Sequence, residues 1–192
     1  MPVLAIDTTT PHGSVALADE AAVLGEVRFR VTDSHSAHVL PAVDFLLETL
    51  GLGPGQLDGC AVTTGPGSFT GLRVGLSTAQ GLALAAGVPC LGVSALDVLA
   101  QRIAGSADVL VPMIDAFRDE VYAAVYERDG RIRSEAVLAA PERLLEGLPP
   151  EPAFIGDGAI KHRERIRAAR PNAVFPSRSL YLAGTLARIV PW

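Results

Sequence analysis

Gly65-Pro66-Gly67-Ser68-Phe69-Thr70-Gly71-Leu72-Arg73-Val74-Gly75 joins a β-like run that ends at Thr64 to an apolar helical run that lasts to Ala86. Three glycines and a proline among its first seven residues predict a sharp turn from strand to helix, with backbone N–H groups exposed near a helix N-terminus. Such a turn can hold an anion or lie tightly against another backbone. The first use indicates an enzyme, and the second indicates a binding subunit.

The spacing of these glycines matches neither a dinucleotide fingerprint nor a P-loop, and no Lys-Ser or Lys-Thr pair follows the last glycine. A second regularity begins within the same stretch. Gly71, Gly75, Ala79 and Ala83 recur every fourth residue and leave one face of the helix almost without side chains. Another helix can approach such a face very closely. Two candidates remain open for that helix: residues 36–50 of the same chain, or a helix of another subunit.

Around this turn the chain alternates between strand-like and helix-like segments. Upstream lie expected strands at 3–8, 14–18 and 23–31 and a helix at 36–50, and then comes strand 59–64. Downstream lie helix 70–86, strand 89–93 and helix 94–104. The helix at 36–50 is supported by one apolar stripe made of Val39, Leu40, Val43, Leu46, Leu47 and Leu50. This alternation predicts an α/β fold.

The pattern then starts again in the second half of the chain. A strand at 109–115 ends in Ile114-Asp115, as the first strand ends in Ile6-Asp7. Further strands are expected at 121–127, at 131–138 and before Gly156, with helices at 141–147, 160–169 and 179–190. This repetition indicates an internal duplication. We expect a first domain at 1–105 and a smaller one at 106–192, whose last helix packs back on the first domain.

Composition narrows the classes of function. Of the 192 residues, 49% are hydrophobic and 19% are charged, and the net charge is −5. Such a chain is a poor candidate for binding nucleic acid alone, so we interpret the basic run 161–167 as a solvated helix face. The N-terminus lacks the pattern of a signal peptide, and no apolar run reaches about 18 residues. We expect a cytoplasmic protein without a membrane segment.

Several motifs together resemble one family. They are Leu4-Ala5-Ile6-Asp7-Thr8-Thr9-Thr10, the helix start His35-Ser36 with Leu40-Pro41, the glycine-rich stretch 65–75, and Ile114-Asp115-Ala116-Phe117-Arg118-Asp119-Glu120-Val121-Tyr122. In this order they resemble the TsaB (YeaZ) family of the bacterial machinery that makes threonylcarbamoyladenosine beside the tRNA anticodon. The likeness runs over most of the chain and is strongest in residues 1–100. Tyr181-Leu182-Ala183 matches the family's Tyr-Leu-Arg only in part, so we expect a divergent or shortened final helix.

The resemblance implies two ASKHA (actin-like, ribonuclease H-like) subdomains, each a mixed sheet flanked by helices, with the second reduced. It implies an accessory subunit that is not itself an enzyme. Such a subunit pairs with the catalytic paralogue TsaD, which holds the metal, and the small ATPase TsaE joins the pair. It also implies a homodimer when the chain is isolated, and contact with tRNA only indirectly through the complex.

Two sets of residues follow from this interpretation. The helices 36–50 and 70–86 would form the partner interface, through His35, Leu40, Val43, Leu47, Phe69, Gly71, Leu72, Gly75, Leu76, Ala79 and Ala83. Asp7, Thr8, Thr9 and Asp115 would line a vestigial nucleotide cleft, in which ATP or ADP is the only cofactor to consider. Each aspartate could instead satisfy the backbone of the hairpin that follows it. The alternative function is a small ATP-dependent kinase or acyltransferase that uses Asp7 and Asp115.

Other reactive residues carry less weight. His35 and His38 are three residues apart at a helix start and could share a metal ion, with Asp33 as a weak third ligand. Ordinary capping and surface hydrogen bonds explain them better, and His162 is expected to be solvated. Ser68 is not in a nucleophile elbow, so we expect it to cap the backbone of the glycine turn.

Overall fold

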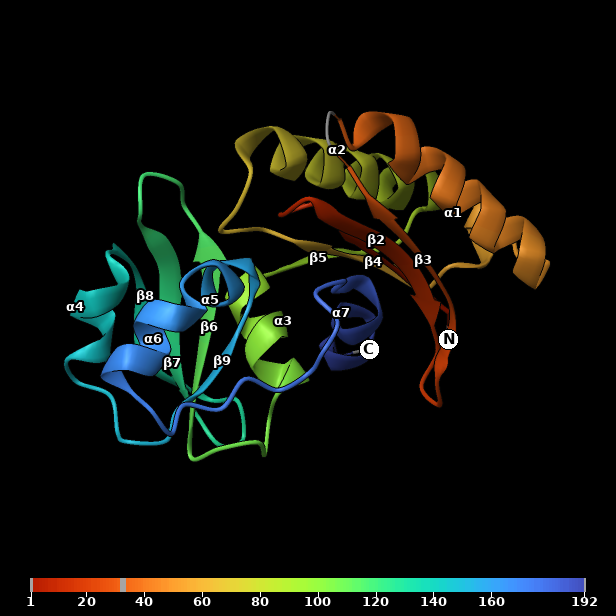
Figure 1. The fold of residues 1–192 in the computed structure, drawn as a ribbon. Coiled ribbons are helices and arrows are strands. Elements are labelled where there is room, and N and C mark those ends of the chain that lie inside the picture. The colour runs from red at the N-terminus through yellow and green to blue at the C-terminus, as the bar shows by residue number, and fades with distance from the viewer. Residues whose placement is uncertain (1, 32–33, 192) are drawn as a thin grey trace. The chain divides into compact units, whose positions relative to one another are not determined.

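A computed structural model describes residues 2–31 and 34–191 (Figure 1). The chain divides into two compact units: one holds the chain up to Ala95 together with the segment from Tyr181, and the other runs from Leu96 to Leu180. The boundary expected from the sequence was at 105/106. The units differ from that division because Asp97 and Gln101 of the following helix bond to Tyr126 and Gly130 of the second unit, whereas the last helix packs on the first sheet.

The first unit is built on a five-stranded mixed sheet. Its elements are β1 (Val3–Asp7), β2 (His12–Ala18), β3 (Val23–Arg30), α1 (Ser36–Leu50), the 3-10 turn η1 (Pro54–Gln56), β4 (Gly59–Thr63), α2 (Phe69–Ala86), β5 (Cys90–Val93) and α7 (Ala183–Ile189). The strand order is β3-β2-β1-β4-β5. β1 is antiparallel to β2 and parallel to β4, as expected for a meander followed by crossover helices.

Helices cover both faces of this sheet (Figure 1). α1 and α2 lie over one face, where alternate strand residues such as Leu4, Ile6 and Val15 are buried in a core. α7 contacts the other face, at β2 and β1. Its approach is close because fully buried alanines such as Ala5 and Ala16 point toward it. Helix α7 therefore covers this second face of the five-stranded sheet.

The second unit has a four-stranded sheet. Its elements are α3 (Ala95–Arg102), β6 (Val109–Asp115), β7 (Val121–Glu127), β8 (Ile132–Ala139), α4 (Pro141–Leu145), β9 (Ala153–Ile155), α5 (Asp157–Lys161) and α6 (Arg163–Ala169). The order β8-β7-β6-β9 repeats the order β3-β2-β1-β4, and no described strand takes the place of β5. Two mixed sheets flanked by helices, the second smaller, confirm the predicted α/β fold.

One expected helix is divided in two. Residues 160–169 do not form a single solvated helix, because His162 ends α5 and begins α6 with φ −101° and ψ 16°. His162 is buried rather than solvated, and Ile166 on the next turn is fully buried. The run is amphipathic, and its apolar side joins the core of the second unit. None of the helices within the described residues is long and apolar enough to cross a membrane.

Candidate functional site

Asp7 is fully buried at the end of β1, and its hydrogen bonds come from its own hairpin and a neighbouring strand. Its Oδ1 accepts from the Thr9 hydroxyl (2.7 Å), the Thr9 backbone N–H (3.2 Å) and the Thr63 hydroxyl (2.7 Å). Oδ2 has no hydrogen-bond partner among the described residues. Burial raises the pKa of this carboxyl, and the hydrogen bonds from Thr63 and Thr9 oppose the rise. These hydrogen bonds join Asp7 to its own hairpin and to β4, which is a structural use of the carboxyl group.

Thr63 was not predicted as part of this group. It ends β4, the parallel neighbour of β1, so its hydroxyl reaches Asp7 across 56 positions of sequence. The sequence carried one usable signal, because two neighbouring parallel strands both end in polar residues just before a turn.

The two threonines after Asp7 form hydrogen bonds with the glycine turn. The Thr8 hydroxyl donates to the Gly71 carbonyl at 2.8 Å, and the Ser68 N–H donates to the Thr9 carbonyl at 2.7 Å. A side chain at Gly67 or Gly71 would overlap the backbone of Thr9 or Thr8. The turn therefore lies against another backbone, which is the second of its two expected uses.

Ser68 caps α2, as predicted. Its hydroxyl accepts a hydrogen bond from the Gly71 N–H at 3.2 Å. The N–H of Leu72 donates to the Ser68 carbonyl at 2.8 Å. The N–H groups of Ser68, Gly71 and Leu72 thus bond within the chain rather than to an anion.

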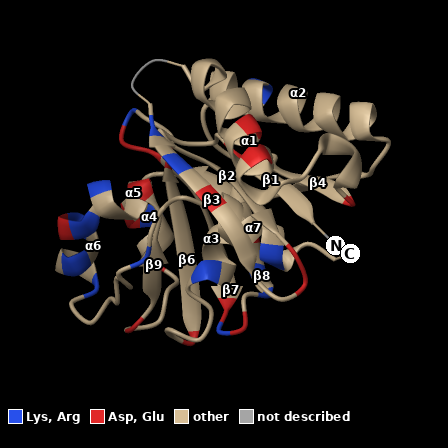
Figure 2. Cartoon of the chain, turned by 90° about the vertical axis from the view of Figure 1, so that its right-hand side faces the viewer, with Lys and Arg blue, Asp and Glu red and all other residues tan. Residues whose placement is uncertain are grey.

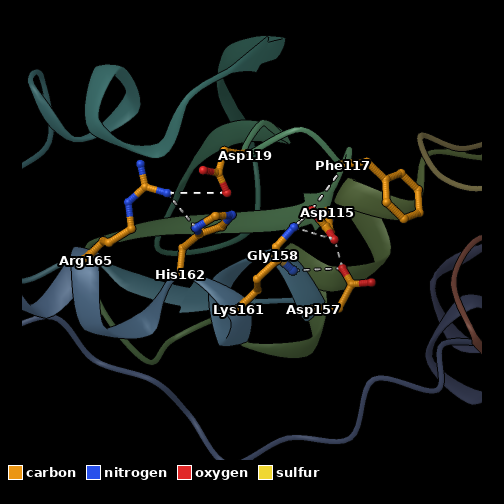
Figure 3. Close-up of polar contacts among 8 residues, drawn as sticks. All are labelled: Asp115, Phe117, Asp119, Asp157, Gly158, Lys161, His162 and Arg165. Atoms are coloured by element: carbon orange, nitrogen blue, oxygen red, sulfur yellow. Dashed lines mark hydrogen bonds and ion pairs between the residues drawn. The ribbon is translucent and has the colours of Figure 1, made fainter.

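Asp115 ends β6 in the second unit and is already paired with a cation (Figure 3). Its carboxylate accepts from Lys161 Nζ at 2.9 and 3.0 Å and from the Phe117 N–H at 3.2 Å. The Asp157 carboxylate accepts in turn from the Asp115 N–H (3.0 Å) and the Gly158 N–H (2.9 Å). Lys161 and Asp157 were missed because they stand more than 40 positions away in the sequence.

The loop after Asp115 is strained. Phe117, Arg118 and Asp119 have φ of 64°, 49° and 61°, so three consecutive residues with side chains adopt the left-handed conformation. Two backbone hydrogen bonds hold the loop, from Ala116 N–H to the Glu120 carbonyl and from Glu120 N–H to the Phe117 carbonyl. The sequence did not predict this geometry, because Phe117 and Arg118 are residue types that seldom adopt it and only Asp119 is of a type enriched there.

The small-residue stripe of α2 does not face outward. Gly71, Gly75, Ala79 and Ala83 are buried against the sheet of their own unit. A side chain at Gly75 would meet the Thr8 hydroxyl and Val62. The prediction that these four residues line a partner interface is wrong. The stripe packs on β1 and β4, where its glycines let the helix backbone approach Thr8.

Three further residues of the predicted interface are also buried, namely His35, Val43 and Leu47. Their assignment to a partner surface is wrong, because Val43 and Leu47 belong to the core of the first unit and His35 is buried just before α1. His35 Nε2 bonds the Thr10 carbonyl at 2.9 Å, and burial lowers the pKa of this histidine. Leu72 and Leu76 are half-buried.

The outer side of α1 and α2 nevertheless carries large apolar side chains. The exposed fractions are 49% for Leu40 and 73% for Phe69, which were predicted, and 59% for Phe45 and 85% for Leu84, which were not. A hollow of about 430 Å³ lies between the two helices and is lined by Leu40, Thr70, Arg73, Val74 and their neighbours. These four side chains, Leu40, Phe45, Phe69 and Leu84, are called the α1–α2 apolar surface below.

The histidines have structural partners. His38 stacks on Phe29 with 5.5 Å between ring centroids, while His35 bonds Thr10 as above. Within residues 2–31 and 34–191, no three His, Cys, Asp or Glu side chains gather as a metal ion requires. Asp33, the weak third ligand, lies outside the described residues.

Comparison with known proteins gives consistent matches. A family model described as "TsaD: tRNA N6-adenosine threonylcarbamoyltransferase" matches residues 27–187. The tRNA threonylcarbamoyladenosine biosynthesis protein TsaB of Escherichia coli (strain K12) is 43% identical over 67% of this chain. That match spans 56% of the E. coli protein, little more than half its length. The TsaB protein of Bacillus subtilis (strain 168) is 31% identical over 86% of this chain and 75% of its own length.

Solved structures agree with these matches. YeaZ from Pseudomonas aeruginosa superposes with a TM-score of 0.82 and 33% identity, over 97% of this chain and 89% of that one. An activator of the 2-hydroxyisocaproyl-CoA dehydratase from Clostridium difficile, solved with ADPNP, gives a TM-score of 0.60 at 9% identity, over 98% of this chain and 93% of that one. The second likeness concerns the fold alone, and it supports the expected ASKHA architecture.

Proposed function

Because the chain belongs to the TsaB family of tRNA threonylcarbamoyladenosine biosynthesis proteins, we propose that it is a non-catalytic subunit that pairs with a TsaD-like catalytic paralogue. The observation that carries this proposal is the α1–α2 apolar surface. Its four large side chains are exposed, although the opposite sides of both helices are buried in the chain's own core. Large apolar side chains left exposed on two neighbouring helices mark a candidate interaction site.

The mechanism of such a subunit is positional. Helices α1 and α2 would pair with the equivalent helices of the paralogue and hold its catalytic cleft in an active geometry. A TsaE-like ATPase would dock on the assembled pair. In the absence of the paralogue, the same apolar surface would pair two copies of this chain.

The surroundings of Asp7 and Asp115, and the bonds already made by Thr8 and Thr9, support a non-catalytic role. A Mg²⁺–nucleotide site needs free carboxylates for the hydrated metal and free hydroxyls for phosphates. Here Asp7 is fully buried, the hydroxyls of Thr8 and Thr9 bond within the unit, and Asp115 is paired with Lys161. These residues do not fit the metal–nucleotide group, and we derive no step through it.

The pairing surface can be tested with Leu40→Asp/Phe69→Asp. We expect the double variant to fold, since both side chains are exposed, and to lose co-elution with the TsaD-like protein. Burying two carboxylates in an apolar interface should weaken pairing by about 30-fold or more, the cost of losing an interface hot spot. Threonylcarbamoylation of tRNA by the reconstituted complex should fall with it.

Ile132→Asp/Leu138→Asp is the matched control, because both residues are exposed apolar side chains of the second unit. It should pair and support activity like the unmodified chain. Normal co-elution of the α1–α2 variant would contradict the proposal. Heat released on titrating Mg-ATP into the isolated chain, and lost in Asp7→Asn, would favour the kinase or acyltransferase alternative.

A further inference from the structure

Two arginines of the second unit lie over one aromatic ring. The guanidinium carbons of Arg163 and Arg167, one turn apart on α6, lie 4.8 and 5.4 Å from the centroid of the Phe175 ring. Phe175 also stacks on Phe154 of β9, with 5.7 Å between centroids and an angle of 26° between the planes. The arginines are thus held by a ring that is itself anchored in the core.

The basic run around α6 sorts into two groups. Lys161 pairs with Asp115, and the Arg165 guanidinium lies 3.8 Å from the Asp119 carboxylate (Figure 3). Arg165 also pairs with Glu142. Arg163, Arg167 and Arg178 form no ion pair with any residue in the described part of the chain. All three are exposed.

Positive charge is concentrated here although the whole chain is acidic. Residues 161–178 contain six basic and one acidic side chain, in a protein of net charge −5. Blue segments accordingly recur along α6 in Figure 2. A hollow of about 290 Å³ lies beside them, and its lining includes Arg163 and Arg178 together with the apolar side chains of Phe175, Phe154 and Ile160.

We propose that Arg163, Arg167 and Arg178 form a direct contact for RNA phosphates, with the Phe175 ring supporting the first two; this set is called the arginine–Phe175 surface. A guanidinium stacked on a ring uses its flat face and keeps its in-plane N–H donors for a phosphate. Stacking also holds the side chain in place, so less conformational freedom is lost on binding. This inference rests on the proposed function, which brings a tRNA to the complex, and it replaces the expectation of a merely solvated helix face.

The test uses fluorescence anisotropy of a labelled tRNA transcript, titrated with the full chain and with its complex with the TsaD-like protein. Arg163→Gln/Arg167→Gln/Arg178→Gln should bind the RNA about tenfold or more weakly near 50 mM salt. The slope of log K against log salt should shrink by about two to three, since each lost phosphate contact contributes roughly 0.7–0.9.

Arg128→Gln/Arg131→Gln/Arg133→Gln removes the same charge from arginines paired with Asp108, Asp129 and Glu127. It should leave affinity and slope near those of the unmodified chain. Equal loss in both triple variants, or no loss in the first, would overturn the proposal. So would loss of co-elution with the TsaD-like or TsaE-like protein at unchanged RNA affinity, because the surface would then bind protein.

The two proposals can fail separately. If only the RNA contact is wrong, the first triple variant keeps its RNA affinity and Leu40→Asp/Phe69→Asp still prevents pairing. If only the pairing function is wrong, the salt slope of the isolated chain still changes. Thermal unfolding of both triple variants should remain cooperative, since all six arginines are exposed. A small fall in melting temperature is expected for each, because the first variant loses two ring contacts and the second loses three ion pairs.

Discussion

Asp7 shows how one residue can look catalytic and yet serve the fold. Its carboxylate lies at the end of the first strand, where an ASKHA enzyme would bind a metal, but three hydrogen bonds from Thr9 and Thr63 converge on one of its oxygens. The other oxygen is buried without a hydrogen-bond partner among the described residues. Burial raises the pKa of this carboxyl above its ordinary value, and the hydrogen bonds from Thr63 and Thr9 oppose the rise.

A pH dependence of stability follows. Because burial raises the pKa of Asp7, the folded chain holds this proton more tightly than the unfolded chain does. The stability from Asp7 is therefore complete below the ordinary pKa of 3.8 and is lost as the pH rises through the folded-state pKa. We expect the free energy of unfolding, measured in urea, to fall less between pH 4 and 8 for Asp7→Asn than for the unmodified chain. Glu48→Gln, at an exposed position of α1, should keep the original slope, and equal slopes for all three proteins would refute the argument.

At the scale of an element, α2 shows that a helix face without side chains can be needed for packing against the sheet of the same chain. The carbonyl and hydroxyl of Thr8 occupy the space in which side chains at Gly71 and Gly75 would stand. The helix therefore lies on β1 and β4 at the distance that glycine allows.

The two kinds of glycine in α2 should respond oppositely to the same substitution. Gly71→Ala adds a methyl group where Thr8 already lies, and it should lower the free energy of unfolding by about 1–3 kcal/mol. Gly81→Ala meets nothing within 4 Å and should raise it by about 0.5–1 kcal/mol through its helix propensity. Urea denaturation measures both. A Gly71→Ala protein as stable as Gly81→Ala would mean that the stripe faces open space.

The bare face of α2 could be predicted from the sequence, but the segment that packs against this face could not. The four-residue period of Gly71, Gly75, Ala79 and Ala83 predicted a bare face, because periodicity reports which side chains share a face. It could not report what covers that face, since Thr8 lies some 60 positions away. The same limit hid Thr63 and Lys161, whereas Ser68 was found because capping is local. Sequence periodicity also gave no sign of the contacts of Arg163 and Arg167 with Phe175, which lies beyond the end of α6.

At the scale of the whole molecule, the second unit is an insertion within the first. Strands β1 to β5 come before Leu96, and α7 returns to the same sheet after Leu180. The Ala183 N–H donates to the Ser14 hydroxyl at 3.0 Å and the Gly184 N–H donates to Glu26 at 3.2 Å, which ties the end of the chain to β2 and β3.

Two matched core substitutions should act on different units. Leu186 of α7 and Ile166 of α6 are both fully buried, and replacing either with alanine should cost about 2–5 kcal/mol. In hydrogen exchange, Leu186→Ala should speed exchange in β1 and β2, and Ile166→Ala should speed it in β6 and β9. If Leu186→Ala instead loosened β6 and left β1 protected, α7 would not belong to the first unit.

The return of α7 has a consequence for synthesis on the ribosome. Residues 96–180 are continuous, so that unit has all its strands as soon as they emerge. The sheet made before it keeps one side uncovered until residues 183–189 are translated, and its alanine-lined face waits for a helix nearly a hundred residues downstream. The half of the chain that leaves the ribosome first is thus the half that matures last.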